Sequence, residues 1–319
     1  MPDTMGDMDI AFPNLGIYLK NVPKSFEIFG FRIALYGVII GIGVLAGVLL
    51  AAHIAKKTGQ DADSYWDLAI YLVIFSIMGA RAYYVIFAWD YYKDNLLGIF
   101  NIRNGGLAIY GGVIAGFITL AFYVRRHKKS YRLMADTGVF GLILGQIIGR
   151  WGNFTNREVF GQYTNNLFAM RIPTSAVRER DISESIIAHM TDGTNFIQVH
   201  PTFLYESVCN LILLVIMLVY LKHRKFHGEI CLMYLGGYGI IRFFVEGIRT
   251  DRLLIEGSNI AVSQLLGICL FVGALITDII VRVILKKRGS RFESDIKYEE
   301  NEKLLLEVKA AREEALKEK

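Results

Sequence analysis

The feature that most constrains this chain is a series of long apolar segments separated by polar ones. A helix needs roughly 20 apolar residues to cross the hydrocarbon core of a membrane. Seven segments have about that length, at 33–55, 66–88, 107–124, 133–150, 203–221, 229–248 and 259–284. Hydrophobic residues make up 53% of the 319 residues, which is typical of a membrane protein. The sequence therefore predicts an all-α integral membrane protein with about seven transmembrane helices.

The distribution of Lys and Arg predicts which side of the membrane each loop faces. Basic clusters occur at 56–57, 125–129, 222–225 and 286–288. Such clusters mark the cytoplasmic side of a membrane protein. We therefore expect the N-terminus outside and the C-terminus in the cytoplasm. The expected parts are an extracytoplasmic or interfacial segment at 1–32, a transmembrane domain at 33–284 that includes an outer loop or head region at 151–202, and a charged cytoplasmic tail at 285–319.

Glycine spacing in two of these segments predicts close packing of helices. Small residues four positions apart let the backbones of two membrane helices approach each other. The first segment carries Gly37, Gly41, Gly43 and Gly47, and the fourth carries Gly138, Gly141, Gly145 and Gly149. This spacing favours close packing of the first segment against another helix, and the glycines of the fourth segment line one of its faces.

Polar residues gather near the predicted outer ends of the helices. A charged side chain near the centre of a membrane helix costs about 2.5–3.5 kcal/mol, so such residues face the bundle interior or a water-filled cavity. In segment 229–248, Tyr238, Arg242 and Glu246 follow one another at i, i+4 and i+8, which places them on one face. The other members of this set are Tyr36, Arg81, Tyr110, Arg150, His200, Glu206 and Arg249.

The excess of arginine in this set predicts an anionic ligand, most simply a phospholipid headgroup. The guanidinium group offers a planar fork of donors that matches a phosphate. The structural alternative is that Arg242 and Glu246 only pair with each other as a buried strut. No spacing typical of a metal site is present, and Cys209, Cys231 and Cys269 lie in apolar runs. We therefore expect neither a metal nor a cofactor.

Four motifs carry a resemblance to a known family. They are GRWGNFTNREVFG at 149–161, RNGGLAIYGG at 103–112, HPTFLYE at 200–206 and YGIIRFFVEGIR at 238–249. The first closely resembles the signature of the prolipoprotein diacylglyceryl transferase family. The resemblance extends from about residue 30 to residue 284 and leaves the charged tail outside.

The resemblance implies a multi-pass transferase of the bacterial cytoplasmic (inner) membrane. It would move the diacylglyceryl group of phosphatidylglycerol to the lipobox cysteine in the signal peptide of a preprolipoprotein, the first step of lipoprotein maturation. The products would be a thioether and glycerol phosphate. The expected partners are therefore phosphatidylglycerol, the preprolipoprotein and the lipid bilayer, with no nucleic acid. The alternative is a lipid or anion transporter, a class that usually shows internal repeats or interrupted helices, and the sequence shows neither.

The resemblance also implies roles for individual residues. Arg150 and Arg242 match the essential arginines of the family, and they would hold the lipid phosphate and stabilise charge developing on it. The candidate catalytic residues are Arg150, Arg242, Tyr110, Glu158 and Asn153. The candidate substrate-binding residues are Tyr36, Gly105, Gly106, Gly161, His200, Glu206, Tyr238, Glu246 and Arg249.

Tyr110 departs from the family pattern, because many members have histidine at that position. An unperturbed tyrosine has a pKa near 10, which is too high for an efficient base at neutral pH. We expect Tyr110 to donate a hydrogen bond to the phosphate, with general-base catalysis as the alternative. The acceptor of the thiol proton is then water, His200 or the leaving phosphate, and the sequence does not distinguish among them.

Overall fold

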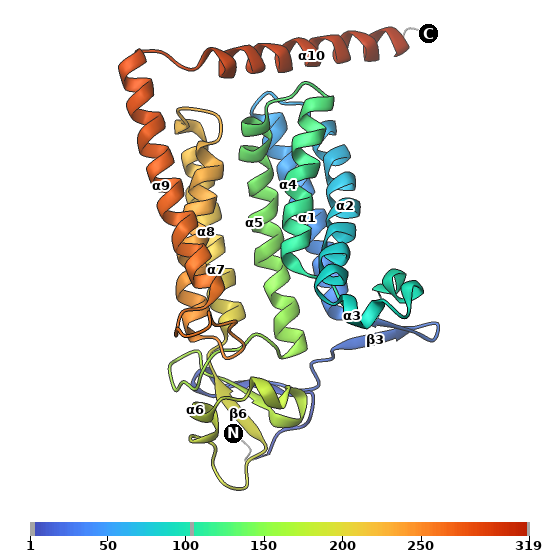
Figure 1. The fold of residues 1–319 in the computed structure, drawn as a ribbon, viewed down its shortest axis with the longest axis vertical. Helices are drawn as coiled ribbons and strands as arrows, with labels where there is room; N and C mark the ends of the chain where they lie inside the picture. Colours follow the sequence, from blue (N-terminus) through green and yellow to red (C-terminus); the bar gives the residue numbers. More distant parts are fainter. Residues whose placement is uncertain (1–3, 103–104, 318–319) are drawn as a thin grey trace. The chain divides into compact units, whose positions relative to one another are not determined.

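The computed structural model describes residues 4–102 and 105–317, and it is mostly helical (Figure 1). Helices dominate because a backbone in lipid must satisfy its hydrogen bonds within each segment. The long helices are α1 (Leu35–Lys57), α2 (Asp63–Phe87), α4 (Ile109–Arg126), α5 (Tyr131–Asn156), α7 (Thr202–Tyr220), α8 (Glu229–Ile248), α9 (Val262–Arg288) and α10 (Glu293–Lys317).

Six of the helices in the described part of the chain are long and apolar enough to cross a membrane. They are α1, α2, α5, α7 with the turn that follows it, α8 and α9. Helix α4, which covers the third predicted segment, has 18 residues and is not among the six. The protein is therefore an integral membrane protein, while the seventh span and the orientation of the termini stay predictions.

The chain divides into two compact units. The first consists of Met1–Gly47, Val139–Lys225 and Glu229–Gly289. The second consists of Val48–Gly138, Phe226–Gly228 and Ser290–Lys319. Helices α7, α8 and α9 belong to the first unit, together with most of α5, while α2, α4 and α10 belong to the second.

In the first unit, α1 and α5 pack through the predicted glycines. A Cβ atom added at Gly47 would lie 2.5 Å from the carbonyl oxygen of Gly141, and one added at Gly43 would lie 3.2 Å from that of Gly145. The expected close approach is thus confirmed for these two pairs. Gly41, in contrast, has no neighbour within 4 Å of such an atom.

Helix α5 ends at Asn156, so the prediction that Arg150 ends the helix is wrong. The apolar run stops at Gly149, but the helix continues because its last turns pack on aromatic side chains. The ring centroid of Phe203 lies 5.4 Å from that of Trp151 and 4.8 Å from that of Phe154. Arg150 consequently lies within the helix, with six further residues beyond it.

The first unit also contains short strands that the sequence did not predict, so the molecule is mostly helical rather than all-α. An antiparallel sheet has the strand order β2-β1-β5-β6. Its strands are β1 (Ile10–Phe12), β2 (Ile17–Leu19), β5 (Met170–Pro173) and β6 (Phe196–Val199), and a separate hairpin pairs β3 (Ser25–Ile28) with β4 (Phe31–Ala34). The sheet joins the N-terminal segment to the loop after α5 around a buried core that includes Ile10, Phe160 and Ile172.

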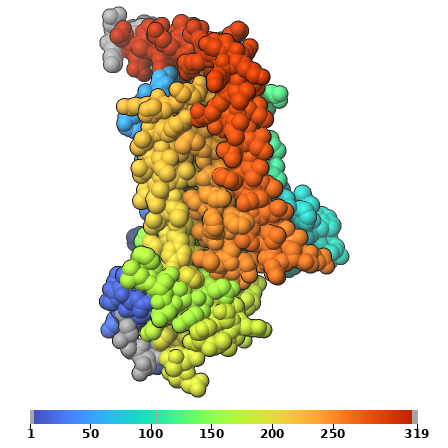
Figure 2. Space-filling view, turned by 90° about the vertical axis from the view of Figure 1, so that its left-hand side faces the viewer, coloured from blue at the N-terminus to red at the C-terminus, as the bar shows by residue number. Residues whose placement is uncertain are grey.

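The outward side of α7 is apolar, as expected for a helix that contacts lipid. Ile212, Val215 and Val219 are each more than half exposed. They lie along the helix that Figure 2 shows in yellow on the face turned to the viewer. The opposite side of α7 is buried and carries its polar residues, including Glu206, Ser207 and Asn210.

In the second unit, α10 crosses the direction of α2 and α4 (Figure 1). Ion pairs attach it at three places along its length. Asp295 binds Arg132 at 2.7 Å, Glu302 binds Lys129 at 2.9 Å, and Lys309 binds Asp61 at 2.8 Å. The charged tail is therefore an ordered helix held by its acidic and basic residues.

Candidate functional site

The centre of the candidate site is the carboxylate of Glu206, in the second turn of α7. This side chain is 1% exposed. Arg150 of α5 approaches it from one side, with Nη2 2.6 Å from Oε1. Arg242 of α8 approaches from another, with Nη1 3.1 Å from Oε2, and the Tyr238 hydroxyl donates to Oε1 over 3.4 Å. One buried carboxylate thus holds two guanidinium groups from two other helices.

The ion pairs continue along α8 from Arg242. Its Nη2 atom lies 2.5 Å from Oε2 of Glu246, and Nη1 of Arg249 lies 3.5 Å from the same oxygen. Arg249 also forms a two-pronged pair with Asp251, at 2.9 and 2.8 Å. Burial raises the pKa of Asp251, but the hydrogen bonds and charge of Arg249 outweigh it and hold that pKa below its usual value. We call Arg150, Glu206, Arg242, Glu246, Arg249 and Asp251 the Glu206 network.

Asn153 links this network to Glu158. Its Oδ1 lies 3.5 Å from Nη1 of Arg150, and its Nδ2 donates to Oε1 of Glu158 over 3.1 Å. Glu158 lies in a tight loop in which Arg157 and Val159 have φ of +57° and +62°. Non-glycine residues adopt such angles at a cost of about 1–3 kcal/mol, so the surrounding contacts must hold this loop in place. The loop turns Glu158 back toward the end of α5.

Two glycines allow other predicted site residues to pack against this region. A Cβ atom at Gly152 would lie 2.7 Å from Cδ2 of Tyr36, so the tyrosine ring rests against the backbone of α5. A Cβ atom at Gly161 would lie 2.8 Å from Cβ of His200 and 2.9 Å from the carbonyl oxygen of Ile248. Gly161 is therefore required where three chain segments meet, and its predicted contact with substrate stays a prediction.

His200 lies just before α7. Its Nδ1 is 3.2 Å from the Tyr205 hydroxyl, and its backbone N–H donates to Gln162 over 3.0 Å. Burial lowers the pKa of His200, because it disfavours the charged imidazolium. A neutral His200 is able to accept a proton. Among the described residues, the hydrogen bond of the His200 ring leads to Tyr205 rather than to the arginines of the Glu206 network.

Arg81, expected to add positive charge near an anion, has a structural role in the second unit. Its five N–H donors bind the carbonyl oxygens of Gly98, Ile99, Asn101, Gly105 and Gly106 at 2.7–3.1 Å. A Cβ atom at Gly106 would lie 2.4 Å from Nη1 of Arg81, which explains the glycine. Arg81 thus shapes the loop before α4 and has no donor left for a ligand.

Tyr110 also belongs to the second unit, as the second residue of α4. This residue is 39% exposed. Two residues of the same motif, Arg103 and Asn104, lie outside the described residues. The predicted roles of Tyr110, Gly105 and Gly106 toward the lipid stay predictions.

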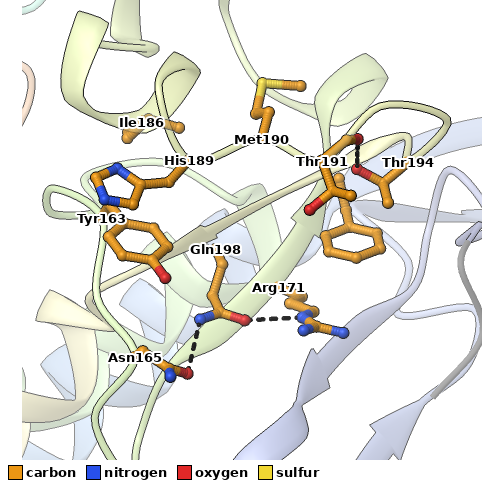
Figure 3. A pocket seen from close by; sticks show the side chains of 10 residues that line it. Tyr163, Asn165, Arg171, Ile186, His189, Met190, Thr191, Thr194 and Gln198 are labelled. Carbon is orange, nitrogen blue, oxygen red and sulfur yellow. Dashed lines mark hydrogen bonds between the residues drawn. The ribbon is translucent and has the colours of Figure 1, made fainter.

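A cavity of about 230 Å³ lies elsewhere in the first unit, beside β5, β6 and the short helix α6 (Glu184–Ile187) (Figure 3). The His189 ring stacks on Tyr163 with centroids 3.9 Å apart. Arg171 donates to Gln198 over 2.9 Å. The Nδ1 atom of His189 lies 2.8 Å from the Ser185 carbonyl oxygen. The described residues that line the cavity include none of the predicted site residues.

The Glu206 network defines the chemistry of the site. The predicted Arg242–Glu246 strut is present, but it is only one link, because Arg242 also shares Glu206 with Arg150. Charged residues inside a membrane are retained where they bind or move a charged group. An integral membrane protein with a buried network of ion pairs between its helices is the class that this fold and site define.

Comparison with known proteins identifies the family within this class. A family profile described as prolipoprotein diacylglyceryl transferase matches residues 23–280. The chain belongs to this family.

Several curated relatives are named phosphatidylglycerol–prolipoprotein diacylglyceryl transferase. The chain is 42% identical to the protein of Finegoldia magna over 256 residues, which cover 80% of this chain and 94% of the relative. It is 36% identical to that of Clostridioides difficile over 266 residues, covering 83% and 96%. It is 38% identical to that of Bacillus cereus over 289 residues, covering 89% and 99%.

Proposed function

We propose that this protein transfers the diacylglyceryl group of phosphatidylglycerol to the lipobox cysteine of a preprolipoprotein in the bacterial cytoplasmic membrane. The family and the names of the relatives support diacylglyceryl transfer from this lipid to a prolipoprotein. The observation that carries the proposal is the Glu206 carboxylate held between Arg150 and Arg242. We propose that the lipid phosphate takes over this position between the two arginines.

The reaction follows from that position. The thiolate of the lipobox cysteine attacks the glyceryl carbon that carries the phosphate ester. A sulfur–carbon bond forms, the carbon–oxygen bond breaks, and its electron pair leaves on the oxygen of glycerol phosphate. Negative charge therefore grows on the phosphate, where Arg150 and Arg242 stabilise it. The hydrogen bond from Tyr110 to the lipid phosphate stays a prediction from the sequence.

The charges of the site indicate where the thiol proton goes. Three arginines, Arg150, Arg242 and Arg249, face the carboxylates of Glu206, Glu246 and Asp251, with Glu158 nearby. An anionic phosphate between the arginines would take the place of a carboxylate in these ion pairs. Glu206 loses arginine contacts when the phosphate binds, so we infer that it accepts the thiol proton, with neutral His200 as the alternative acceptor.

The topology belongs to the same proposal. We propose seven spans, with α4 as the third, the N-terminus and residues 151–202 outside, and α10 in the cytoplasm. The Glu206 network then faces the outer leaflet, where a signal peptide presents its cysteine. The alternative of a lipid or anion transporter predicts no covalent change in either substrate.

The test uses purified protein, vesicles of phosphatidylglycerol and a synthetic lipobox peptide, with mass spectrometry of the peptide. The wild-type chain should produce a diacylglyceryl thioether. Arg150→Lys and Arg242→Lys keep the charge but lose the planar fork, and each should lower turnover about tenfold to a hundredfold.

Arg252→Lys is the matched control, because Arg252 lies outside the Glu206 network and only approaches the Gly247 carbonyl at 3.4 Å. It should retain turnover. Absence of the thioether with the wild-type protein would contradict the function. Near-normal turnover of both network variants would contradict the phosphate clamp.

A further inference from the structure

A second layer of polar side chains lies one helical turn from the Arg150–Glu206 pair. Gln146 precedes Arg150 by four residues on α5, and Asn210 follows Glu206 by four residues on α7. Both steps lead toward the middle of their helices, and each corresponds to about 6 Å along the axis. Because Arg150 and Glu206 are in contact, Gln146 and Asn210 lie at the same depth. The Ser207 hydroxyl, which donates to the Ile147 carbonyl over 3.0 Å, fixes the same register.

Tyr234 of α8 joins this layer to the Glu206 network. The Nε2 atom of Gln146 lies 2.8 Å from the Tyr234 hydroxyl. The Tyr234 ring stacks on Tyr238 with centroids 5.7 Å apart and an angle of 7°. Tyr238 in turn donates to Glu206. The two layers are therefore adjacent parts of one polar interior between α5, α7 and α8.

The amides of this second layer have unused hydrogen-bonding atoms. Asn210 is 0% exposed, and neither its Oδ1 nor its Nδ2 has a partner among the described residues. The same holds for Oε1 of Gln146. An amide inside a membrane helix that makes no hydrogen bond is unfavourable, so these side chains indicate a polar ligand. The oxygen and nitrogen of an amide are interchangeable by a flip. Gln146 can therefore accept from Tyr234 and direct its N–H₂ group to the same ligand as Asn210.

We propose that Asn210 and Gln146 bind the acyl-ester carbonyls of the lipid, an inference that rests on the proposed function. A phospholipid whose phosphate lies at Arg150 and Arg242 directs its acyl chains toward the middle of the membrane. The ester carbonyls are the first polar atoms on that path and are separated from the phosphate only by the glycerol backbone. An ester carbonyl accepts hydrogen bonds but cannot donate them. The side-chain amides of Asn210 and Gln146 offer N–H donors at that depth.

This subsite positions the reacting carbon. The arginines hold the lipid at its phosphate, and the amides hold it on the other side of the glycerol backbone. A group fixed at two points loses most of its freedom to rotate, which is how binding accelerates a substitution reaction. Asn210 and Gln146 are thus positioning residues for the diacylglyceryl group.

The test compares phosphatidylglycerol that carries two acyl esters with its dialkyl ether analogue, which lacks the carbonyls. The measured quantity is the ratio of kcat/KM for the ester lipid to that for the ether lipid. In Asn210→Leu and in Gln146→Met this ratio should fall about tenfold relative to the wild type, because one hydrogen bond to a buried group is lost. Ser207→Ala is the matched control, since Ser207 is buried on the same helix and its hydroxyl already has a partner. It should keep the wild-type ratio.

Taking the ratio within each variant cancels differences in folded amount. If Asn210→Leu does not fold, the ratio of kcat/KM for the ester lipid to that for the ether lipid in Gln146→Met tests the proposal. An unchanged ratio in the folded variants would overturn the subsite and leave the amides to bind water. A wild-type protein that produces no thioether from the ester lipid would instead overturn the proposed function.

Discussion

At the scale of single residues, Glu206 is the side chain on which the site depends. Its carboxylate is the shared partner of Arg150 and Arg242, and all three belong to different helices. Removing one partner from a buried ionic cluster leaves unpaired charge, which costs about 3–5 kcal/mol. Glu206 therefore stabilises the bundle in the absence of lipid, in addition to any part that it takes in the reaction.

Tyr110 carries the first prediction at this scale. If it donates a hydrogen bond to the phosphate, Tyr110→Phe should lower kcat/KM about tenfold to a hundredfold, the effect of losing one bond to a charged group. Tyr110→His should remain active, because histidine also donates. An unchanged kcat/KM in Tyr110→Phe would show that the Tyr110 hydroxyl does not contribute to the reaction and that the ring only packs. Abolished turnover with intact lipid binding and an altered pH profile would instead make it the general base.

The sequence predicted Arg150, Glu206, Arg242, Glu246 and Arg249 of the Glu206 network because charges at one depth of a membrane bundle converge. It did not predict Asp251, which follows α8. It did not predict that Arg81 and Arg157 are structural. Arg157 binds the carbonyl oxygens of Met8 at 2.5 Å and Val22 at 2.6 Å, and such contacts with distant backbone leave no pattern in the sequence. The sequence also did not predict a role for Asn210 or Gln146, because a single amide side chain does not interrupt an apolar segment.

At the scale of elements, the packing of α1 against α5 predicts opposite effects for two glycines of α1. A methyl group at Gly47 meets the Gly141 carbonyl at 2.5 Å, whereas one at Gly41 meets nothing within 4 Å. Gly47→Ala should therefore lower the free energy of unfolding by about 1–3 kcal/mol. Gly41→Ala should leave it unchanged or raise it by up to about 1 kcal/mol, because alanine favours the helix. Unfolding in detergent measures both, and equal effects would contradict the helix contact.

A second prediction at this scale concerns the N-terminal sheet. Asp9 accepts hydrogen bonds from the Tyr18 hydroxyl at 2.6 Å and from the N–H groups of Asn21 and Gly6 at 3.0 Å. The bonds from Tyr18 and Asn21 hold the pKa of Asp9 below its ordinary value of 3.8, against the opposing effect of burial. A folded pKa below the unfolded value gives stability above pH 3.8 that is lost as the pH falls through the folded pKa.

Asp9→Asn should therefore make the N-terminal segment more sensitive to protease at neutral pH, and the difference from wild type should vanish as the pH falls through the folded pKa of Asp9. The exposed neighbour Asp7 provides the control variant, Asp7→Asn. A difference that persists at acid pH would show that the charge of Asp9 is not responsible.

The helices were predictable to within a few residues because lipid demands a long apolar run. Segment 229–248 coincides with α8, while α5 extends six residues beyond its predicted end at 150. The strands have three or four residues each, too few to show an alternating pattern. Their pairing also joins segments far apart in the chain, and that relation is absent from any local stretch of sequence.

At the scale of the whole molecule, the orientation in the membrane predicts accessibility from opposite sides. Asn165 and Lys128 are both exposed in the structure. In a chain in which the three native cysteines (Cys209, Cys231 and Cys269) are replaced by alanine, Asn165→Cys should react with an impermeant thiol reagent from outside. Lys128→Cys should react only after the membrane is opened, and labelling of both from one side would contradict the seven-span topology.

The pairing of Glu206 with two arginines also bears on selectivity. A side chain tethered beside its partners competes like a dissolved anion at millimolar concentration or more. A small anion that reaches the bundle must displace the Glu206 carboxylate, and it makes no other contact that would offset the lost ion pairs. A phospholipid brings its phosphate together with ester carbonyls and two acyl chains, and these supply the extra affinity. If the lipid phosphate binds as proposed, Glu206 therefore acts as a built-in competitor that selects a phosphate attached to lipid over free phosphate.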